Sequence, residues 1–244
     1  MFLRKGSKDL DGLGPPGACS YPRCEPGGVF YNIFMRKILF CIFLFAASFA
    51  NAFELKTGDF VFQAGPGSDF ERAISAATSG RKNVPFTHVG VAERGSDGVF
   101  VWESSPQGGV KRTPLGIFLA EAAVWDGKPA VEVFRLKRRY RALIPAAMAR
   151  IRALEGRPYD FLFLPDNEVY YCSELVQTAF LDGHGAFLFP SAPMSFADKE
   201  TGRVSPLWVS YFSARGAAVP EGVPGTNPGD MSKSGVLKSV HRYF

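Results

Sequence analysis

Cys172 is the residue of this sequence whose position best suits chemistry. Apolar residues recur at helical spacing after it, so we expect an amphipathic helix to begin at this cysteine. The unpaired backbone N–H groups and the positive dipole end of a helix favour a thiolate, the nucleophilic form of cysteine. The same amides can donate hydrogen bonds to an oxyanion that develops on a substrate carbonyl. The position therefore predicts nucleophilic attack on a carbonyl group.

A thiolate mechanism also needs an imidazole, first as the ion-pair partner and then as the acid that protonates the leaving group. The chain has three histidines. His184 follows a helix end and His241 lies near the chain terminus, so both are expected at the surface or at helix ends. His88 lies in a predicted strand and shares one face with Gly90 and Ala92. Because these small neighbours leave room above that face, His88 is the predicted base.

A predicted β-hairpin supplies a carboxylate for this histidine. Two β-rich runs, residues 87–93 and 99–103, flank a turn that is rich in glycine. If the turn is centred just after Gly95, Glu103 lies directly opposite His88. Cross-strand neighbours have Cβ atoms about 5 Å apart, so Glu103 can orient the imidazole by accepting its second N–H. A slip of one residue would place Glu103 on the other face.

Each of these residues also has a structural interpretation. Cys172 alone could be a buried core thiol, since free cysteine packs well beneath helices. His88 alone could be a core histidine with satisfied hydrogen bonds, and Glu103 could be a solvated strand end. A cysteine at a helix start together with a strand histidine and a glutamate on the same face favours catalysis over these alternatives.

The remaining patterns predict the elements that must position these side chains. They indicate strands at residues 60–62 and 131–134, helices at 69–78, 115–122, 142–154 and from 172 to about 182, and a loop or bent strand at 157–171. The last thirty-odd residues are rich in glycine and proline and are expected to form wrapping loops with one terminal element. No internal repeat or long linker is visible, so the expected fold class is α+β with antiparallel strands.

The first part of the chain has the pattern of a targeting segment. Residues 35–37 are Met-Arg-Lys, residues 38–49 are apolar and residues 50–52 are Ala-Asn-Ala, which matches a secretory signal with cleavage after Ala52. The apolar run is shorter than the about 20 residues that a membrane-spanning helix needs. Residues 1–34 precede a complete signal and are expected to be a mis-started or disordered extension. The mature chain, residues 53–244, is therefore expected to be one exported domain, periplasmic or secreted.

The composition is that of a globular protein, with 46% hydrophobic and 21% charged residues. Without residues 1–52 the net charge is only slightly positive, which gives no support for nucleic-acid binding. The same removal leaves Cys172 as the sole cysteine, so no internal disulfide can form. Such a thiol can be buried and inert, can pair with another chain or can be reactive.

The sequence gives no indication of a metal or cofactor. Its histidines and the mature chain's single cysteine lack the close spacing of a zinc site, and no glycine-rich phosphate loop is present. The basic run at residues 135–139 is expected to be a solvated edge before a helix, with peripheral contact to an anionic membrane surface as the alternative. Several aromatic residues, Phe60, Phe62, Phe100, Trp102, Phe161 and Phe163, are expected in the core, although some could line a groove for an acyl chain.

Four stretches of the sequence together resemble the permuted papain-fold amidases typified by YiiX and YaeF, relatives of the NlpC-type cell-wall peptidases. They are Gly58-Asp59, Thr87-His88-Val89-Gly90 with Glu103 downstream, Gly156-Arg157-Pro158-Tyr159-Asp160, and Tyr171-Cys172-Ser173-Glu174-Leu175-Val176. Histidine precedes cysteine, as in the permuted branch. The resemblance implies a permuted papain-like fold in which Cys172 is the nucleophile, His88 the base and Glu103 the orienting residue. It also suggests Tyr159 and Ser173 as oxyanion or substrate-binding residues.

Three functions follow as hypotheses. The first is an exported cysteine hydrolase that cleaves an amide, such as a cell-wall peptide bond, through a thioacyl intermediate. The second is a lipid-directed acyl hydrolase or acyltransferase that uses the same residues, and the third is a binding module that keeps the fold without catalysis. The substrate is thus a cell-wall peptide or an acyl lipid, and no nucleic-acid partner is expected.

Overall fold

The computed structural model describes residues 53–78 and 80–244 of the chain. The predicted extension at residues 1–34 and the predicted signal at residues 35–52 lie outside the described residues, so both stay predictions. No helix within the described residues has the length and apolar character needed to cross a membrane.

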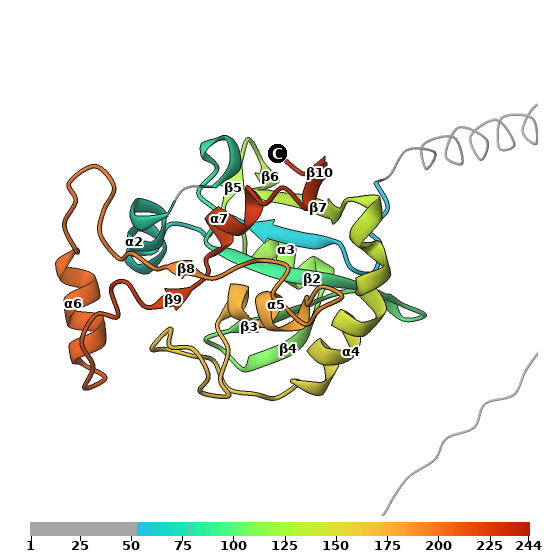
Figure 1. Ribbon diagram of the computed structural model, residues 1–244. Coiled ribbons are helices and arrows are strands. Elements are labelled where there is room, and N and C mark those ends of the chain that lie inside the picture. The colour runs from blue at the N-terminus through green and yellow to red at the C-terminus, as the bar shows by residue number, and fades with distance from the viewer. Residues whose placement is uncertain (1–52, 79) are drawn as a thin grey trace, which may run out of the picture. The chain divides into compact units, whose positions relative to one another are not determined.

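A six-stranded antiparallel sheet forms the centre of the described chain (Figure 1). Its order is β10-β7-β1-β2-β3-β4, in which the strands are β1 (Phe60–Gln63), β2 (His88–Gly95), β3 (Gly98–Ser105), β4 (Gly109–Pro114), β7 (Val131–Leu136) and β10 (Leu237–Arg242). Two small ribbons lie outside this sheet, β5 (Val124–Trp125) with β6 (Lys128–Pro129) and β8 (Ala192–Pro193) with β9 (Pro224–Gly225). The predicted α+β class with antiparallel strands is confirmed.

Six α-helices and two short 3-10 helices occur in the described chain. They are α2 (Asp69–Ala77), α3 (Leu115–Ala120), α4 (Ile144–Ala153), α5 (Cys172–Ala179), α6 (Pro206–Ser213) and α7 (Pro228–Ser232), with short 3-10 helices at Arg81–Asn83 and Arg138–Leu143. The predicted helices at 69–78, 115–122 and 142–154 are confirmed, with ends that differ by a few residues. The predicted helix from Cys172 is also confirmed, and it ends at Ala179.

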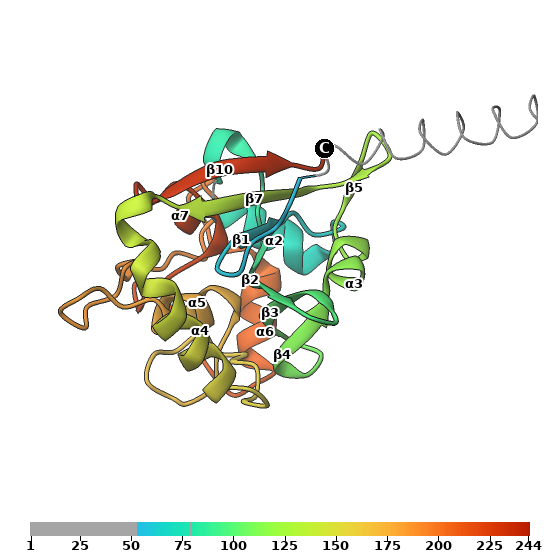
Figure 2. The same cartoon turned by 90° about the vertical axis from the view of Figure 1, so that its right-hand side faces the viewer.

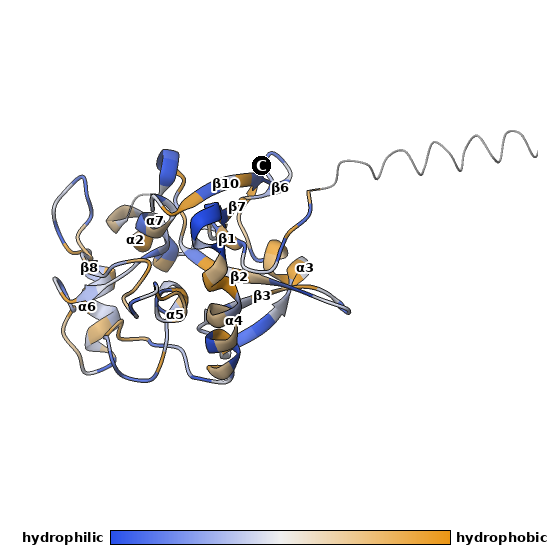
Figure 3. Cartoon of the chain, turned by 45° about the vertical axis from the view of Figure 1, so that its right-hand side comes forward, coloured by the Kyte–Doolittle hydropathy of each residue, from blue (hydrophilic) through white to orange (hydrophobic). Residues whose placement is uncertain are grey.

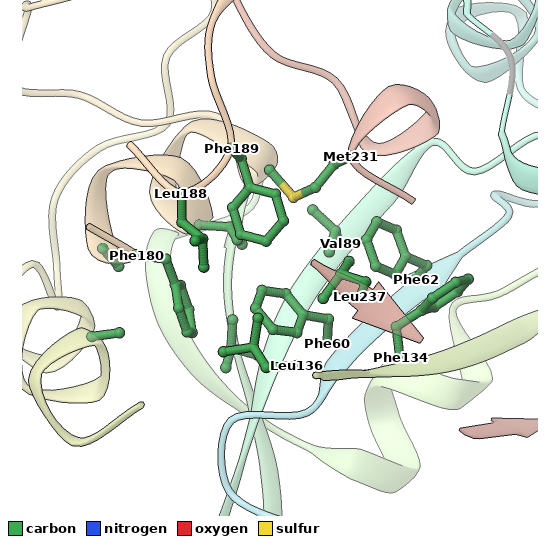
Figure 4. Close-up of a cluster of buried hydrophobic side chains, with 14 of the residues drawn as sticks. Phe60, Phe62, Val89, Phe134, Leu136, Phe180, Leu188, Phe189, Met231 and Leu237 are labelled. Carbon is green, nitrogen blue, oxygen red and sulfur yellow. The ribbon is translucent and has the colours of Figure 1, made fainter. Parts of the chain in front are cut away.

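Successive side chains along each strand point to opposite faces of the sheet. On β1, Phe60 and Phe62 point to one face, where they pack beneath α4, α5 and α7, whereas Val61 points to the other. Figure 2 shows α4 and α5 against the sheet, and Figure 4 shows the aromatic cluster beneath them. The opposite face is covered by α3 through Phe118, and this helix is coloured hydrophobic in Figure 3.

A third cluster lies beside the sheet rather than on it. It joins α6 to α2 and to the loop before α5 through mostly aromatic side chains, Phe163, Tyr171, Phe196, Trp208 and Phe212. Of the residues expected in the core, Phe60, Phe62 and Trp102 lie there. Phe163 is also buried, in this third cluster, so its expected place in the core is confirmed, whereas Phe161 is 38% exposed.

Several regular elements were not predicted. Strand β4 follows the hairpin as a third antiparallel strand, although Pro114, at its end, correctly marks the start of α3. Helix α6 begins at Pro206 with Ser205 as its N-cap. The terminal region contains β9, α7 and β10 rather than the one element expected, and β10 completes the sheet beside β7.

Candidate active site

Cys172 is the first residue of α5, and the chain before it is extended, so the helix begins at the thiol. The backbone N–H of Tyr171 donates to Glu174 Oε2 at 3.2 Å, which caps the first turn. Cys172 is 6% exposed and packs at the border of the main core. The expected position at a helix N-terminus is therefore present.

The segments around α5 are held by side chains from distant parts of the chain. The Ser104 hydroxyl on β3 donates to the carbonyl oxygen of Tyr170. The Tyr171 hydroxyl accepts from the Thr226 N–H at 3.0 Å. The side-chain amide of Gln177 donates through Nε2 to the Phe189 carbonyl at 2.7 Å. These bonds fix the direction of α5 and thus the place of the sulfur.

His88 stands at the first position of β2, and its Nε2 lies 2.6 Å from Glu103 Oε2 on β3. The Glu103 side chain is almost fully buried. Its other oxygen accepts from the Thr113 hydroxyl and lies 3.8 Å from Lys111 Nζ, both on β4. Because each carboxylate oxygen has a partner, the plane of the carboxylate and hence the ring of His88 are well determined.

The predicted register of the hairpin is wrong, although the predicted hydrogen bond exists. Val91 pairs with Trp102 rather than with Phe100, so the pairing is shifted by two residues from the expected register and the centre of the turn by one. A shift of two residues keeps every side chain on its face. Glu103 therefore still lies on the face of His88, with its Cβ beside Gly90, and reaches the imidazole diagonally.

The thiol of Cys172 is the second partner of His88. Since Nε2 faces Glu103, Nδ1 is the ring nitrogen left for the sulfur. Burial by itself lowers the pKa of His88, but hydrogen bonds to Cys172 and Glu103 and the attraction of both groups outweigh it and raise this pKa to about 10. His88 is therefore an imidazolium at neutral pH.

The electrostatics of Glu103 follow from the same contact. Burial by itself raises the pKa of Glu103, but the hydrogen bond and charge of His88, with smaller effects from Thr113 and Lys111, bring it below its usual value. Glu103 is thus a carboxylate at neutral pH. The described residues bring Cys172, His88 and Glu103 together in one chain of contacts.

Tyr159 and Ser173 lie next to this group. Burial, and then the neighbouring Cys172, raise the pKa of Tyr159 well above its usual value, so its phenol remains a hydrogen-bond donor. Ser173 is fully buried, and its Oγ is one of the buried polar atoms without a hydrogen-bond partner in the part of the chain described. Tyr159 and Ser173 line the same pocket as Cys172, so a substrate bound at the sulfur would lie next to both side chains.

Cys172 lies between two concave regions of different character. We call the first the apolar pocket; its wall contains Ser173 and the largely apolar set Ile74, Ala77, Phe163, Met194, Phe196 and Trp208. We call the second the polar cleft; its wall contains His88 and mostly polar or charged side chains, including Gln63, Ser68, Glu71, Ser105, Gln107 and Glu121. Cys172 and Tyr159 line both regions. A substrate bound across the sulfur would therefore place its two halves in different surroundings.

Two acidic residues of the recognised stretches have structural contacts. Asp160 accepts from the N–H groups of Leu162 and Leu164, each at 2.8 Å, and so stabilises the turn after Tyr159. Asp59 forms a bidentate pair with Arg135, with distances of 2.6 and 2.7 Å, which ties β1 to β7. The expectation that residues 135–139 form a solvated edge is therefore wrong for Arg135.

Lys111 and Thr113 were not found from the sequence, because β4 was not predicted. A signal for this strand exists. Gly108 and Gly109 both have positive φ and form a turn, and the β-branched residues Val110 and Thr113 follow it, which is typical of a short strand. Of the remaining histidines, His184 is exposed and His241 stacks on Phe53, so neither belongs to the site.

The fold is similar to a solved structure described as "Crystal structure of metalloprotein yiiX from Escherichia coli O157:H7, DUF1105". The TM-score is 0.63 at 23% sequence identity, and the match covers 79% of this chain and 99% of the other. At this identity the likeness shows the fold. Comparison with curated protein sequences gives no match.

The word metalloprotein in that description raises the question of a metal at this site. Glu103 contacts Nε2 of His88, which leaves Nδ1 for the sulfur of Cys172. The carboxylate and the sulfur are therefore on opposite sides of the imidazole ring. Among the described residues no group of three or more His, Cys, Asp and Glu side chains is arranged to hold a metal ion. The donors present among the described residues do not fit a metal ion.

A family comparison covers most of the described chain. Residues 54–241 match the family described as "Permuted papain-like amidase enzyme, YaeF/YiiX, C92 family". The span contains the strand that carries His88, the hairpin partner Glu103 and the helix that begins at Cys172. The chain belongs to this family of permuted papain-like amidases, and it is a cysteine hydrolase of the amidase and peptidase type.

Proposed function

We propose that the chain is an exported cysteine amidase that cleaves an amide with an apolar acyl group through a thioacyl intermediate. The observation that carries this proposal is the contact chain from Cys172 through His88 to the buried Glu103, at the N-terminus of α5. Export rests on the sequence pattern of residues 35–52 alone.

The first half of the reaction follows from these contacts. The sulfur attacks the amide carbonyl carbon, a C–S bond forms and the carbonyl oxygen becomes negative. The N–H groups at the start of α5 and the Tyr159 phenol are suited to stabilise this oxygen. His88 then donates its Nδ1 proton to the amide nitrogen, the C–N bond breaks and the amine leaves. Glu103 is a positioning residue that keeps the ring oriented and favours the imidazolium.

The second half regenerates the Cys172 thiolate and the His88 imidazolium. Neutral His88 accepts a proton from water, the oxygen of which attacks the thioester, and the C–S bond breaks to release the acid. His88 lines the polar cleft but not the apolar pocket. The leaving amine and the incoming water are therefore assigned to the polar cleft, and the acyl group to the apolar pocket.

The lining of the apolar pocket favours one of the substrate classes. Its wall residues Phe163, Phe196 and Trp208 suit a hydrocarbon or other apolar acyl group better than the polar acyl part of a cell-wall peptide. A cell-wall peptide amide is the second candidate, supported by the polar cleft, which suits a hydrophilic leaving group. A binding module without catalysis is disfavoured because it does not require an imidazolium beside Cys172, the only cysteine among the described residues.

The test compares the mature chain with its Cys172→Ala and Cys172→Ser variants on fatty-acyl amides, fatty-acyl esters and cell-wall peptide fragments. We expect hydrolysis of fatty-acyl amides by the unaltered chain and a loss of at least about 10³-fold in both variants, with unchanged circular dichroism. Intact mass spectrometry should show an acyl adduct on Cys172 that hydroxylamine removes. His88→Ala should be as damaging, whereas the exposed, remote His184→Ala is the matched control. Undiminished turnover in both cysteine variants would refute the proposal.

A further inference from the structure

Two hydrogen-bond donors in the wall of the apolar pocket have no partner. In the part of the chain that the structure describes, three buried side-chain nitrogen or oxygen atoms lack a hydrogen-bond partner, namely Arg112 Nε, Ser173 Oγ and Trp208 Nε1. Ser173 is fully buried and Trp208 is 2% exposed. Both line the apolar pocket, whereas Arg112 lies on β4, opposite Trp102, and is not part of that wall.

An unpaired donor in such surroundings is unfavourable. A buried N–H or O–H that gives up its bonds to water without replacement costs free energy, so such groups are rare in folded proteins. The packing of the pocket wall does not explain the Ser173 hydroxyl or the Trp208 N–H. Trp208 is already held by ring contacts to Phe70, Phe196 and Phe212, and Ser173 lies within α5 next to the nucleophile. Packing therefore accounts for the two side chains but not for their polar atoms.

The chemistry of the two donors indicates what would pair with them. An indole N–H can only donate, and a serine hydroxyl can donate as well. One carbonyl oxygen has two lone pairs and no hydrogen, so it can accept from both. A plain hydrocarbon chain would fill the same space and leave both donors unpaired.

We infer that the acyl group bound in the apolar pocket carries a second carbonyl oxygen, a ketone or an amide, which accepts hydrogen bonds from Ser173 and Trp208. This inference rests on the proposed function, since it assumes that the acyl half of the substrate occupies this pocket. It makes Ser173 and Trp208 specificity-determining residues. The preferred acyl group is then apolar in its body but oxygenated within its chain, as in an N-acylated amino acid or an oxoacyl chain.

The test uses p-nitroanilides whose acyl chains have equal length: nonanoyl, a series of oxononanoyl groups with the ketone moved along the chain, and hexanoylglycyl. We expect the best oxygenated probe to exceed nonanoyl in kcat/KM by about tenfold or more, the factor that two modest hydrogen bonds supply. The ketone and the amide probes distinguish the two sources of the oxygen.

The variants Ser173→Ala and Trp208→Phe should each bring that ratio towards one. Phe196→Leu alters the same wall without removing a donor, so it should change both probes together and keep the ratio. If Trp208→Phe folds poorly, replacement of Trp208 by benzothienylalanine removes the N–H and preserves the two-ring shape. An unaltered ratio in both Ser173→Ala and the Trp208 variant overturns the inference, as does a ratio near one in the unaltered chain.

A second measurement separates this inference from the proposed function. The Cys172→Ala variant is titrated by calorimetry with nonanoic acid and with its oxo and hexanoylglycine counterparts. Tighter binding of an oxygenated acid, lost on Ser173→Ala, supports the inference even where no probe is hydrolysed. Hydrolysis of all probes at equal rates supports the proposed function and overturns the inference. Failure of every acid to bind overturns the inference as well.

Discussion

At the scale of single residues, the site is defined by how charge is distributed around His88. The ring lies between the Cys172 thiol and the Glu103 carboxylate, and both favour its protonated form. The Glu103 carboxylate is in turn stabilised by the Thr113 hydroxyl and by Lys111. Burial opposes all of these charges, so the imidazolium depends on its partners rather than on solvent. Removal of one partner should therefore be visible as a change in pH dependence.

We expect Glu103→Gln to move the alkaline limb of the pH–kcat/KM profile to lower pH by about 1 pH unit or more. In the unaltered chain the imidazolium persists up to a pKa of about 10. The substitution removes a negative charge and a charge-assisted hydrogen bond from the protonated ring, so the proton dissociates at lower pH. The rate of Cys172 alkylation by iodoacetamide against pH gives the same information without a substrate.

Glu121→Gln is the matched control for this experiment. Glu121 lies along the same polar cleft and the substitution removes the same charge, but it does not contact His88. Its profile should stay within experimental error of the unaltered chain. An alkaline limb that stays in place in Glu103→Gln, or that moves equally in Glu121→Gln, would show that Glu103 does not control the imidazolium.

At the scale of elements, the hairpin shows which part of the site a sequence can predict. The alternation along residues 88–92 and 99–103 assigns His88 and Glu103 to faces, and this assignment does not change when the register shifts by two residues. The position of the turn was not predictable in the same way, because all four residues of Gly95-Ser96-Asp97-Gly98 are good turn formers. The structure places Ser96 and Asp97 between the paired glycines.

Gly90 is the residue of β2 that allows the two strands to bring His88 and Glu103 together. A Cβ added at Gly90 would lie 2.4 Å from Val101 Cγ1 and 2.7 Å from the Trp102 carbonyl oxygen, and it would face the Cβ of Glu103 at 3.5 Å. Any larger residue must push β3 away from β2. The hydrogen bond between His88 and Glu103 crosses this same gap.

Gly90→Ala should therefore lower stability by about 1–3 kcal/mol, the usual cost of overpacking, and reduce kcat/KM by at least about tenfold through the displaced Glu103. Urea unfolding and steady-state kinetics measure the two effects. Gly116→Ala in α3 is the matched control, because a Cβ at Gly116 meets no atom within 4 Å. Equal behaviour of the two variants would contradict this role of Gly90.

At the scale of the whole molecule, the sequence indicates the fold class, the three central residues and a part of the wall of the apolar pocket, namely Tyr159, Phe163 and Ser173, but not the rest of that wall. Periodicity reports on neighbours along one element, whereas the apolar pocket is assembled from α2, the loop before α5, the segment around Phe196, α6 and the loop before α7. The importance of Trp208 depends on contacts with Phe70 and Phe196, which no local pattern encodes. Likewise, β10 joins the sheet by pairing with β7, a contact between residues far apart in the chain.

Glu174 makes part of the stability of the whole molecule depend on pH, and this part should be lost as the pH rises. Glu174 is 8% exposed in the first turn of α5, and burial raises its pKa from 4.5 to about 8, despite the hydrogen bond from the Tyr171 N–H. The folded chain therefore holds this proton more tightly than the unfolded chain. Its contribution to stability is complete below pH 4.5 and is lost as the pH rises to about 8. His88 has the same sign in a later window, from 6.5 to about 10.

Glu174→Gln should abolish the loss of stability that Glu174 causes as the pH rises, and it should leave the later loss that His88 causes. Glutamine keeps an acceptor oxygen for the Tyr171 N–H but cannot ionise, so the decrease in the free energy of unfolding that Glu174 causes between pH 4.5 and 6.5 should disappear from the pH profile. Urea unfolding at a series of pH values measures the slope of this profile. The exposed Glu155→Gln in the turn after α4 is the control and should keep the slope of the unaltered chain. An unchanged slope in Glu174→Gln would mean that the buried carboxyl is not what couples α5 to pH.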